Sequence, residues 1–295
     1  MIVVTTPTGS IGHLVVEDLL LKGAPVRVIV RDPSRLHAEV RDRVEIFAGS
    51  HSDPAVLAEA FAGADALFWL VPPNPRAESL EAAYVEFTRP AVAALQNAGV
   101  RRAVSVSALG RGTSWRDRAG LVSASLDADD LLASAGIAFR ALTMPSFMDN
   151  LLRQAGSIRD QGVFFSPISE DLKLPTCATA DIASAAVRLL LDDSWSGQGE
   201  TPVLGPEDLS HREMAEIASD VLGRPVRYQR VTFEAFESGL KESGMTPAFV
   251  RGYVDMMRAK DEGMDNAEPR TPESTTPTSF RQWCETELKP AVQPL

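Results

Sequence analysis

Cysteine is scarce in this sequence, and aromatic residues are few. Cys177 and Cys284 are the only cysteines, and they stand far apart. Such a pair is neither a disulfide framework nor a zinc-binding spacing, and it fits a reducing cytoplasm, where we expect the protein. Aromatic residues make up 6% of the chain, which leaves no obvious platforms for stacking nucleic-acid bases.

Positive charge is in deficit as well. The formal net charge is -11, and no run of lysine or arginine offsets it locally. That charge repels nucleic acids and anionic membranes, so we expect neither as a partner. There is also no basic leader and no apolar stretch of about 18 residues, so we expect neither secretion nor a membrane span. Any bound anion must be held by local amides and one or two arginines.

What the chain does contain is a regular alternation of strand-like and helix-like segments over residues 1–145. Gly23, Gly63, Gly99 and Gly136 each follow a helical segment, where a left-handed cap favours glycine. Strands that alternate with crossover helices predict an α/β fold with a doubly wound parallel sheet, a Rossmann-type domain. The expected strands are 2–5, 26–30, 44–47, 66–71, 103–107 and 137–143, and the expected helices are 11–22, 54–62, 78–98 and 121–135.

The alternation becomes irregular after residue 145. Residues 176–205 contain a helical segment and a short strand that we expect to complete the first domain. The other segments of 146–295 are mainly helical, and we expect them to form a smaller lid that binds the substrate. The helices expected there are 211–222, 233–243, 247–260 and 280–288, with a loop at 263–277.

The stretch from Thr5 to Gly12 joins the first strand to an amphipathic helix. Small residues there let the backbone approach a pyrophosphate, and the start of the helix supplies free N–H groups and a positive dipole end. Gly12 allows the helix to pack closely on the sheet. An ordinary strand-to-helix turn has similar glycine spacing, but the position inside the first βαβ unit favours a dinucleotide site.

The end of the second strand bears on the choice between NADP and NAD. An acidic residue there would bind the 2′-hydroxyl of NAD, but the strand ends in Val30. Arg31, together with Arg35, offers planar donors for a 2′-phosphate, so we expect NADP(H) to be preferred. NAD(H) stays possible because Asp32 is close enough in sequence to contact a ribose. The plain alternative is a pair of solvated loop arginines.

Several stretches together resemble the NmrA-like branch of the atypical short-chain dehydrogenase/reductases. They are Thr6 to Gly12, Val26 to Pro33, Pro145 to Asn150, and Gly205 to His211 with Gly223 to Val226. The resemblance spans nearly the whole chain, and the combination is specific although no single motif is. Members of this family include NAD(P)H-dependent quinone and aromatic-polyketide reductases, and also regulators without catalysis.

The resemblance implies a cofactor over the carboxyl ends of the strands. Two positions depart from the family pattern: Thr6 replaces the first glycine of the turn, and Ser50 replaces an acidic residue beside the adenine. The implied contacts are Thr6, Thr8, Gly9, Ser10, Ile11 and Gly12 at the pyrophosphate, Arg31 and Arg35 at the adenosine phosphate, Gly49, Ser50 and His51 at the adenine, Leu70, Val71 and Pro72 at the ribose, and Ser107 and Pro145 near the nicotinamide.

The usual acid of short-chain reductases is missing. That acid is a tyrosine whose pKa is lowered by a lysine one helical turn later, and Tyr84, Tyr228 and Tyr253 all lack such a lysine. The family's alternative lysine is absent near Ser125. A quinone or a polycyclic aromatic ketone needs no enzymatic acid, because its anion is delocalised or takes a proton from a neighbouring phenol. Positioning the hydride donor against a flat ring then suffices.

We therefore expect an NAD(P)H-dependent oxidoreductase that reduces a small aromatic substrate, a quinone or polycyclic ketone, in polyketide tailoring or oxygenation. A partner oxygenase or a homo-oligomer would suit that role. Two alternatives stay open: a non-catalytic NAD(P)-responsive sensor that binds a protein partner, and an isomerase or epimerase with tightly held cofactor.

Other candidate residues carry weaker signals. Ser107 is the one catalytic candidate, although a strand-end serine is more often a plain cap. The four histidines are scattered, and we expect no metal site. Candidates for the substrate pocket, each more simply explained by core or lid packing, are Trp115, Phe147, Met148 and Asn150.

Overall fold

The computed structural model describes residues 1–293, and the chain divides into two compact units. The first unit comprises Met1–Ala108, Ala124–Thr143 and Ile182–Thr201. The second comprises Leu109–Ser123, Met144–Asp181 and the chain from Pro202 onward. Part of the expected 176–205 segment therefore joins the first unit, whereas residues 109–123, expected in the first domain, belong to the second.

The first unit is built around a seven-stranded sheet with the strand order β10-β6-β5-β4-β1-β2-β3. The pairs β1–β2, β2–β3, β1–β4 and β4–β5 are all parallel. All residues of β1 and β4 are buried, as expected for strands covered on both faces. The strands are β1 (Ile2–Thr5), β2 (Val26–Val30), β3 (Glu45–Ala48), β4 (Ala66–Trp69), β5 (Arg102–Ala108), β6 (Ala138–Met144) and β10 (Gln198–Pro202).

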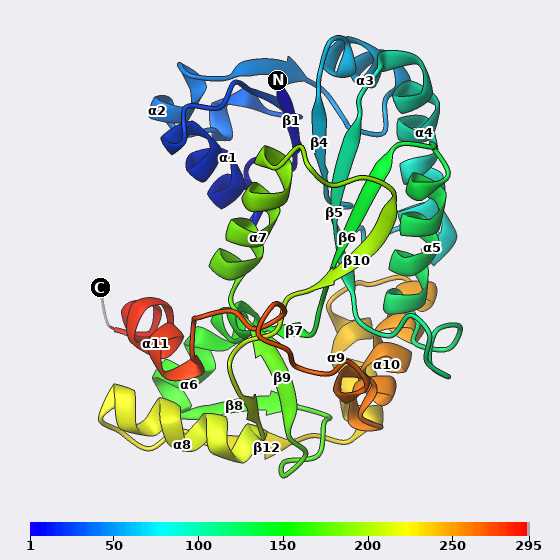
Figure 1. Ribbon diagram of the computed structural model, residues 1–295. Helices are drawn as coiled ribbons and strands as arrows, with labels where there is room; N and C mark the ends of the chain where they lie inside the picture. Colours follow the sequence, from blue (N-terminus) through cyan, green and yellow to red (C-terminus); the bar gives the residue numbers. More distant parts are fainter. Residues whose placement is uncertain (294–295) are drawn as a thin grey trace. The chain divides into compact units, whose positions relative to one another are not determined.

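Helices cover both faces of this sheet, which confirms the doubly wound class. Figure 1 shows α3, α4 and α5 on one face and α1 and α7 on the other. The core of the first face contains Phe61, Leu95 and Leu132 from its three helices. The helical segments are α1 (Gly12–Leu21), η1 (Pro33–Arg35), α2 (Ala38–Arg41), α3 (Pro54–Phe61), η2 (Ala82–Glu86), α4 (Phe87–Ala98), α5 (Leu121–Ala133) and α7 (Thr179–Leu191).

Local signals in the sequence account for where these helices begin and end. Asp53 caps α3 by accepting a hydrogen bond from the N–H of Ala55, and Pro54 occupies the first helical position. Gly99 follows α4 with φ of +75°, and Gly136 follows α5 with φ of +78°. Only glycine adopts this left-handed conformation without strain, so the helix end expected before Gly99 is confirmed. The other helix, α5, ends at Ala133, two residues before the expected end at 135.

The second unit combines short helices with two small sheets. One sheet orders β11 (Asp208–Leu209), β9 (Leu174–Cys177) and β7 (Ser146–Phe147), and the other pairs β8 (Val163–Ser166) with β12 (Arg227–Arg230). Ser210 and Glu213 form a capping box at the start of α8. The helical segments are η3 (Met148–Gln154), α6 (Ala155–Gln161), α8 (His211–Leu222), α9 (Phe233–Glu242), α10 (Pro247–Asp261), η4 (Met264–Ala267), α11 (Phe280–Trp283), η5 (Cys284–Leu288) and α12 (Lys289–Val292).

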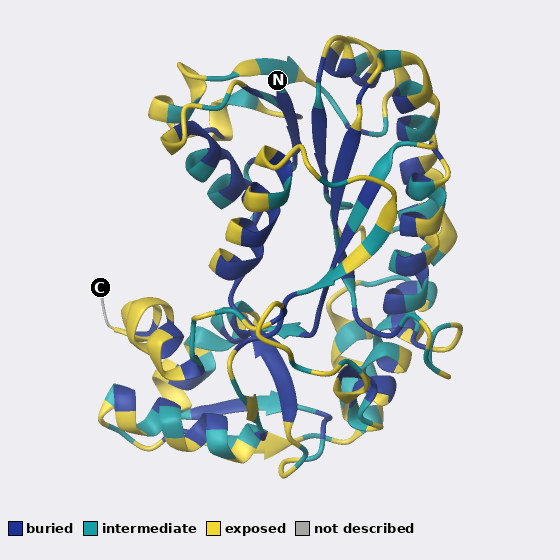
Figure 2. Ribbon diagram, viewed as in Figure 1, coloured by how far each residue is buried: buried dark blue, intermediate teal, exposed yellow. Residues whose placement is uncertain are grey.

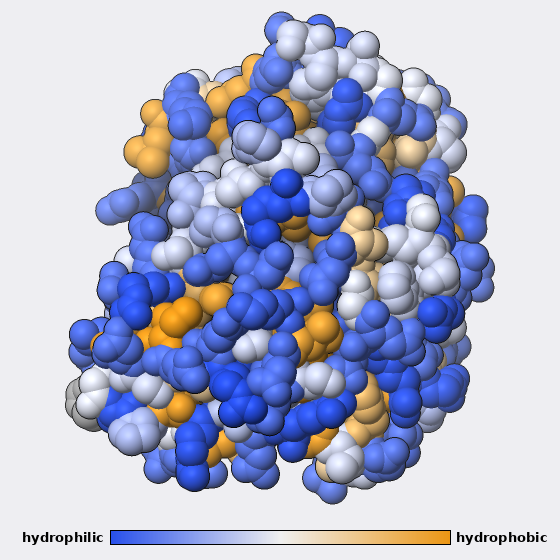
Figure 3. Space-filling model, turned by 60° about the horizontal axis from the view of Figure 1, so that its bottom comes forward, coloured by the Kyte–Doolittle hydropathy of each residue, from blue (hydrophilic) through white to orange (hydrophobic). Residues whose placement is uncertain are grey.

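Burial follows these layers. Figure 2 shows the central strands of the first unit in dark blue and the outer helix surfaces in yellow. Hydrophilic residues cover most of the face drawn in Figure 3, with small separate hydrophobic areas. Within residues 1–293, no helix is long and apolar enough to span a membrane, and no group of three or more metal-binding side chains occurs. Cys177 and Cys284 are both buried as free thiols.

Candidate functional site

The turn after β1 is made by a threonine in a left-handed conformation. Thr6 has a φ of +51° and is the only non-glycine residue with positive φ in the described chain. A β-branched residue is strained there, because its Cβ crowds the backbone. Thr6, which replaces the first glycine of the family pattern, therefore adopts the positive φ without a glycine's freedom. Its buried Oγ1 has no hydrogen-bond partner among residues 1–293.

The conformation of Thr6 explains why Gly12 is needed. The carbonyl oxygen of Thr6 accepts a hydrogen bond of 3.0 Å from the N–H of Gly9 and lies against the start of α1. A Cβ at residue 12 would lie 2.0 Å from that oxygen and 2.8 Å from its carbonyl carbon. Any side chain at Gly12 would therefore force the backbone of the turn to move.

The start of α1 fits an anionic ligand. Ile11 occupies the cap position, and it makes no side-chain hydrogen bond to the helix. The first turn contains no acidic residue. Helix N–H groups that lack a capping side chain, together with the helix dipole, attract phosphate groups. Thr8, Gly9 and Ser10 lie in the same turn, so these residues suit the pyrophosphate of a dinucleotide.

Two arginines follow β2, and neither is paired. Arg31 and Arg35 are exposed, and neither forms an ion pair or a side-chain hydrogen bond with another described residue. Asp32 behaves differently, because its Oδ1 accepts hydrogen bonds from the N–H of Ser34 at 3.0 Å and from its hydroxyl at 2.7 Å. These bonds lower the pKa of Asp32. The carboxylate is thus turned into its own loop, whereas the arginines are available to a phosphate.

The segment after β3 is tied to the ends of β2 and β4. The N–H of Gly49 donates to the carbonyl of Val30 at 2.9 Å, and its φ of +154° favours glycine. His51 Nε2 lies 3.1 Å from the carbonyl oxygen of Leu70. The rings of Trp69 and Phe87 meet the imidazole edge to face, with centroids 5.1 and 4.8 Å away.

Burial governs the protonation of His51. Desolvation, with a smaller effect of the positive charge of Arg31, lowers its pKa to about 4, although the hydrogen bond to Leu70 acts in the opposite direction. The imidazole is therefore neutral at pH 7. Its Nε2 donates to the carbonyl of Leu70, which links the segment after β3 to the end of β4. The structure thus gives His51 a supporting position next to the expected adenine and ribose segments.

A threonine that the sequence analysis missed holds the ends of β1 and β4 together. The buried hydroxyl of Thr5 donates to the carbonyl of Phe68 at 3.1 Å and accepts from the N–H of Leu70 at 3.0 Å. This side chain positions the Leu70–Pro72 segment beside the turn at Thr6. The sequence feature that could have identified Thr5 is a polar residue at the end of an otherwise apolar strand.

Ser107 points its hydroxyl at a buried carboxylate. It donates a short hydrogen bond to Asp129 Oδ2, and Ser105 donates to Asp129 Oδ1 at 2.7 Å. All three side chains are buried. A hydroxyl has one proton, and Ser107 donates it to Asp129. Toward a ligand at the end of β5, Ser107 is therefore mainly a hydrogen-bond acceptor. The sequence analysis did not identify Asp129.

The remaining candidates belong to the second unit. Pro145 is buried, Phe147 pairs with Cys177 between β7 and β9, and Asn150 is exposed. Met148 is 1% exposed and packs in the core of this unit. Trp115 donates from Nε1 to Glu262 at 2.8 Å. Their roles toward a substrate stay predictions.

The chain matches the NmrA-like family over residues 1–272, and it belongs to that family. It is 31% identical over 245 residues to an NAD(P)H azoreductase of Xenophilus azovorans, which covers 83% of this chain and 82% of the relative. It is 26% identical over 265 residues to quinone oxidoreductase 2 of Escherichia coli, covering 89% and 87%.

Solved structures share the fold. That quinone oxidoreductase, in complex with NADPH, superimposes with a TM-score of 0.74 at 24% identity over 99% of this chain and 98% of the other. NmrA, a negative transcriptional regulator in complex with NADP, gives a TM-score of 0.69 at 15% identity, covering 97% and 95%. The expected family and fold are thereby confirmed.

Proposed function

We propose that this chain is an NAD(P)H-dependent oxidoreductase that prefers NADP(H) and reduces a small aromatic acceptor, such as a quinone, an azo dye or a polycyclic aromatic ketone. The observation that carries the proposal is the uncapped start of α1 beside two unpaired arginines, Arg31 and Arg35. Dinucleotide phosphates need such a cradle. The activities named for the azoreductase and the quinone oxidoreductase support reductase chemistry.

The residues of the chain bind and orient, and the bound dinucleotide supplies a hydride. The turn from Thr6 to Gly12 holds the pyrophosphate, and Arg31 holds the adenosine phosphate. In the overall reaction one NADPH, one quinone and one proton give NADP⁺ and a hydroquinone. The second hydrogen of the hydroquinone is that proton, which water can deliver because the hydroquinone anion is delocalised over its ring.

Two side chains that could donate a proton, Ser107 and Tyr228, are already engaged elsewhere. The hydroxyl of Ser107 donates to Asp129. Tyr228 donates to the carbonyls of Ser166 and Ile168, and burial raises its pKa to about 12. We therefore expect Ser107→Ala to lower the rate by no more than about tenfold, the value of one neutral hydrogen bond. Single-turnover rates at saturating NADPH measure this loss, and a loss of more than about 1,000-fold would reveal a general acid.

The decisive experiment is a spectrophotometric screen of NADPH and NADH oxidation. The panel contains quinones, azo dyes and ketones with a neighbouring phenol, with simple aliphatic ketones as negative controls. We expect oxidation with the aromatic acceptors and none with the aliphatic ketones, whose reduction creates a localised alkoxide. Oxidation of neither cofactor by any acceptor, with NADPH binding intact, would favour a sensor instead.

A finer role is part of the proposal. Reduction of a polycyclic ketone in aromatic-polyketide tailoring would supply an electron-rich ring to a partner oxygenase. A homo-oligomer is a second possible assembly, and the cytoplasm stays the expected location. The fold of NmrA keeps a regulatory function as the second candidate, because that protein is a transcriptional regulator with the same architecture.

A further inference from the structure

A buried carboxylate in the first unit lies between two serines of β5. The Oδ1 atom of Asp129, on α5, accepts a hydrogen bond from Ser105 at 2.7 Å, and its Oδ2 accepts another from Ser107. Asp129, Ser105 and Ser107 are 4%, 1% and 6% exposed. Ser107 has the largest exposed fraction and lies one residue before the end of β5 at Ala108. Of the three, Ser107 is therefore the side chain placed to meet a ligand at the carboxyl end of the sheet.

The carboxylate fixes the direction of the hydrogen bond that Ser107 can offer. Each carboxylate oxygen faces one serine hydroxyl. An ionised carboxylate accepts but does not donate, so each serine gives it its single proton. A hydrogen bond to a charged acceptor is about twice as strong as a neutral one, so a neutral ligand does not draw this proton away. What remains for a ligand is the lone pairs of Ser107.

We infer that Asp129 makes Ser107 a hydrogen-bond acceptor that selects aromatic substrates with an O–H or N–H donor on the ring. The inference rests on the proposed function and deepens it, because it names a substituent of the substrate. Asp129 is a positioning residue in this role, since it acts through the proton of Ser107. A carbonyl or ether oxygen placed beside Ser107 would meet another lone pair and stay without a donor, which weakens binding.

The selection acts on the substrate rather than on the cofactor. A nicotinamide carries a carboxamide, which can turn either its oxygen or its NH2 group toward a neighbour. The direction that Asp129 imposes on Ser107 therefore excludes neither NADPH nor NADH. An ether oxygen on a rigid aromatic ring has no proton to offer, whereas a ring hydroxyl has one, so the two substituents are told apart.

A neighbouring hydroxyl provides a matched control. The strand β6 lies next to β5, and the N–H of Ala138 donates to the carbonyl of Arg101 at 3.1 Å, a register that places Thr143 beside Ser107. Register partners on adjacent strands have side chains on the same face of the sheet. Thr143 is 1% exposed, and its Oγ1 has no hydrogen-bond partner in the described chain. Its hydroxyl therefore resembles that of Ser107 in place but is not directed by Asp129.

The test is calorimetry with the intact protein saturated with NADP⁺, which cannot reduce the ligand. The probes are hydroxynaphthoquinones, each paired with its methyl ether, so that a methyl group replaces the proton that Ser107 would accept. We expect the hydroxyl member of a pair to bind about three- to tenfold more tightly than its ether, the value of one hydrogen bond. With NADPH in place of NADP⁺, kcat/KM should show the same preference relative to Ser107→Ala, a comparison in which the intrinsic reactivity of the quinones cancels.

Matched substitutions separate a directed hydrogen bond from simple packing. Ser107→Ala should remove the preference for the hydroxyl member, whereas Ser107→Thr keeps the hydroxyl and should keep the preference. Asp129→Leu leaves Ser107 in place but frees its proton, so that Ser107 can also donate to an ether, and the preference should disappear. Asp129→Ala serves the same purpose if the leucine variant does not fold. Thr143→Val removes the neighbouring hydroxyl and should leave the preference unchanged. Circular dichroism and NADPH binding check that each variant is folded.

A second arm of the experiment examines the cofactor. The acetylpyridine analogue of NADPH has a methyl group in place of the amide nitrogen, so it lacks the donor of the carboxamide. If Ser107→Ala changes the preference for NADPH over this analogue but not the preference within the quinone pairs, Ser107 accepts from the cofactor and the inference is wrong.

The outcomes separate this inference from the proposed function. A preference for the ethers, or one that Ser107→Ala leaves unchanged, would overturn the inference whatever the turnover. An equal loss in Thr143→Val would do the same, because that hydroxyl does not bond to Asp129, and so would the absence of binding by both members of every pair. If the pairs bind with the expected ratio but no acceptor oxidises NADPH, the selective site stands and the reductase proposal fails.

Discussion

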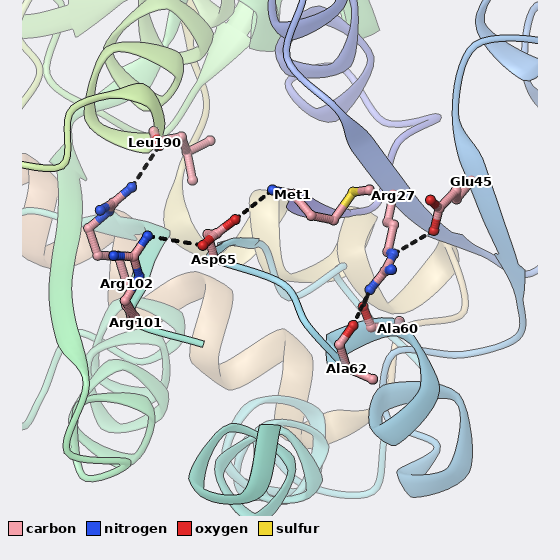
Figure 4. A network of polar contacts seen from close by, with 9 residues as sticks. All are labelled: Met1, Arg27, Glu45, Ala60, Ala62, Asp65, Arg101, Arg102 and Leu190. Carbon is pink, nitrogen blue, oxygen red and sulfur yellow. Dashed lines mark hydrogen bonds and ion pairs between the residues drawn. The ribbon is translucent and has the colours of Figure 1, made fainter. Parts of the chain in front are cut away.

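The two edges of the first unit's sheet differ in how their charges are satisfied. At the amino edge, where the strands begin, charged groups bind one another or backbone carbonyls (Figure 4). Asp65 binds the amino group of Met1 at 2.7 Å and Arg101 at 2.9 Å. Arg27 binds Glu45 at 2.6 Å and also donates to the carbonyl of Ala60.

At the carboxyl edge, where the strands end, comparable groups lack protein partners. Arg31 and Arg35 are unpaired among the described residues, α1 begins without a capping side chain, and Thr6 Oγ1 is buried without a partner. Buried or clustered polar groups are normally satisfied within a protein. The amino edge is satisfied within the protein apart from the buried Nε of Arg102, whereas the carboxyl edge has the unpaired groups that we expect where a ligand binds.

The largest expected effect follows from Gly12→Ala, which places a Cβ against the carbonyl of Thr6. The turn must shift, so its N–H groups no longer converge on a phosphate. Losing two charge-assisted bonds should weaken NADPH binding by more than about 100-fold. The strain should also lower the free energy of unfolding by about 1–3 kcal/mol. Calorimetry and urea unfolding measure the two effects.

The matched control is Gly156→Ala, because a Cβ there meets no atom within 4 Å and Gly156 lies in α6. This variant should bind NADPH normally and be no less stable than the unmodified protein. Binding within about threefold of normal in Gly12→Ala would show that the phosphate loop lies elsewhere.

Removing one arginine from each edge tests the comparison directly. Arg31→Ala should reduce the preference for NADPH over NADH by roughly 10- to 100-fold, because a charge-assisted hydrogen bond is worth about 1.5–3 kcal/mol. Binding of NADH should change little. Arg101→Ala, at the amino edge, removes the same charge from a group already paired with Asp65, and should leave the cofactor preference intact. Equal effects of the two variants would contradict the distinction between the edges.

Ionisable groups at the two edges should lower the free energy of unfolding in different ranges of pH. The pKa of His51, at the carboxyl edge, is lowered from 6.5 to about 4, so the unfolded chain binds its proton first as the pH falls. The contribution of His51 to the free energy of unfolding is complete above about pH 6.5. It should fall by about 2 kcal/mol between pH 7 and pH 5. The lowered pKa of Asp65, at the amino edge, acts only at more acidic pH, below its ordinary value of 3.8.

Urea unfolding of the unmodified protein and of His51→Gln at about pH 7 and pH 5 measures the His51 share. His211 in the second unit serves as the comparison, since burial lowers its pKa to about 4 as well. His51→Gln and His211→Gln should each remove one part of the acid sensitivity. An unchanged loss of stability in both variants would show that other groups are responsible.

The parts of the fold that the sequence predicts are those set by local chemistry. Gly99 marks a helix end, Asp53 with Pro54 marks a helix start, and apolar runs mark buried strands. The expected strand 44–47 is β3 shifted by one residue, and the short strand expected within residues 176–205 is β10, at Gln198–Pro202. These small shifts arise because hydrogen bonding to a neighbouring strand sets the exact bounds.

Features that depend on distant partners were not predictable in this way. The strands of the second unit's small sheets have two to four residues and pair with segments far along the chain, so they carry no periodic signal. The meeting of Ser107 with Asp129 has the same cause. By contrast, Arg31 and the turn from Thr6 to Gly12 are adjacent to strand ends in the sequence itself, which made the candidate site visible.

The smallest expected effect concerns Thr6, where the carboxyl edge carries strain. Replacing Thr6 by glycine relieves a left-handed conformation that costs an L-residue about 1–2 kcal/mol, and it removes a buried hydroxyl without a partner. The greater freedom of glycine in the unfolded chain takes back about 0.5–1 kcal/mol. Thr6→Gly should therefore raise the free energy of unfolding by no more than about 1 kcal/mol, while NADPH affinity stays within about threefold. Thr6→Ala keeps the Cβ, and with it the strain, while it removes the hydroxyl and the γ-methyl group, so it should be less stable than Thr6→Gly. If both variants instead weakened NADPH binding by about tenfold, the hydroxyl of Thr6 would be a cofactor ligand and the strained turn would serve to place it.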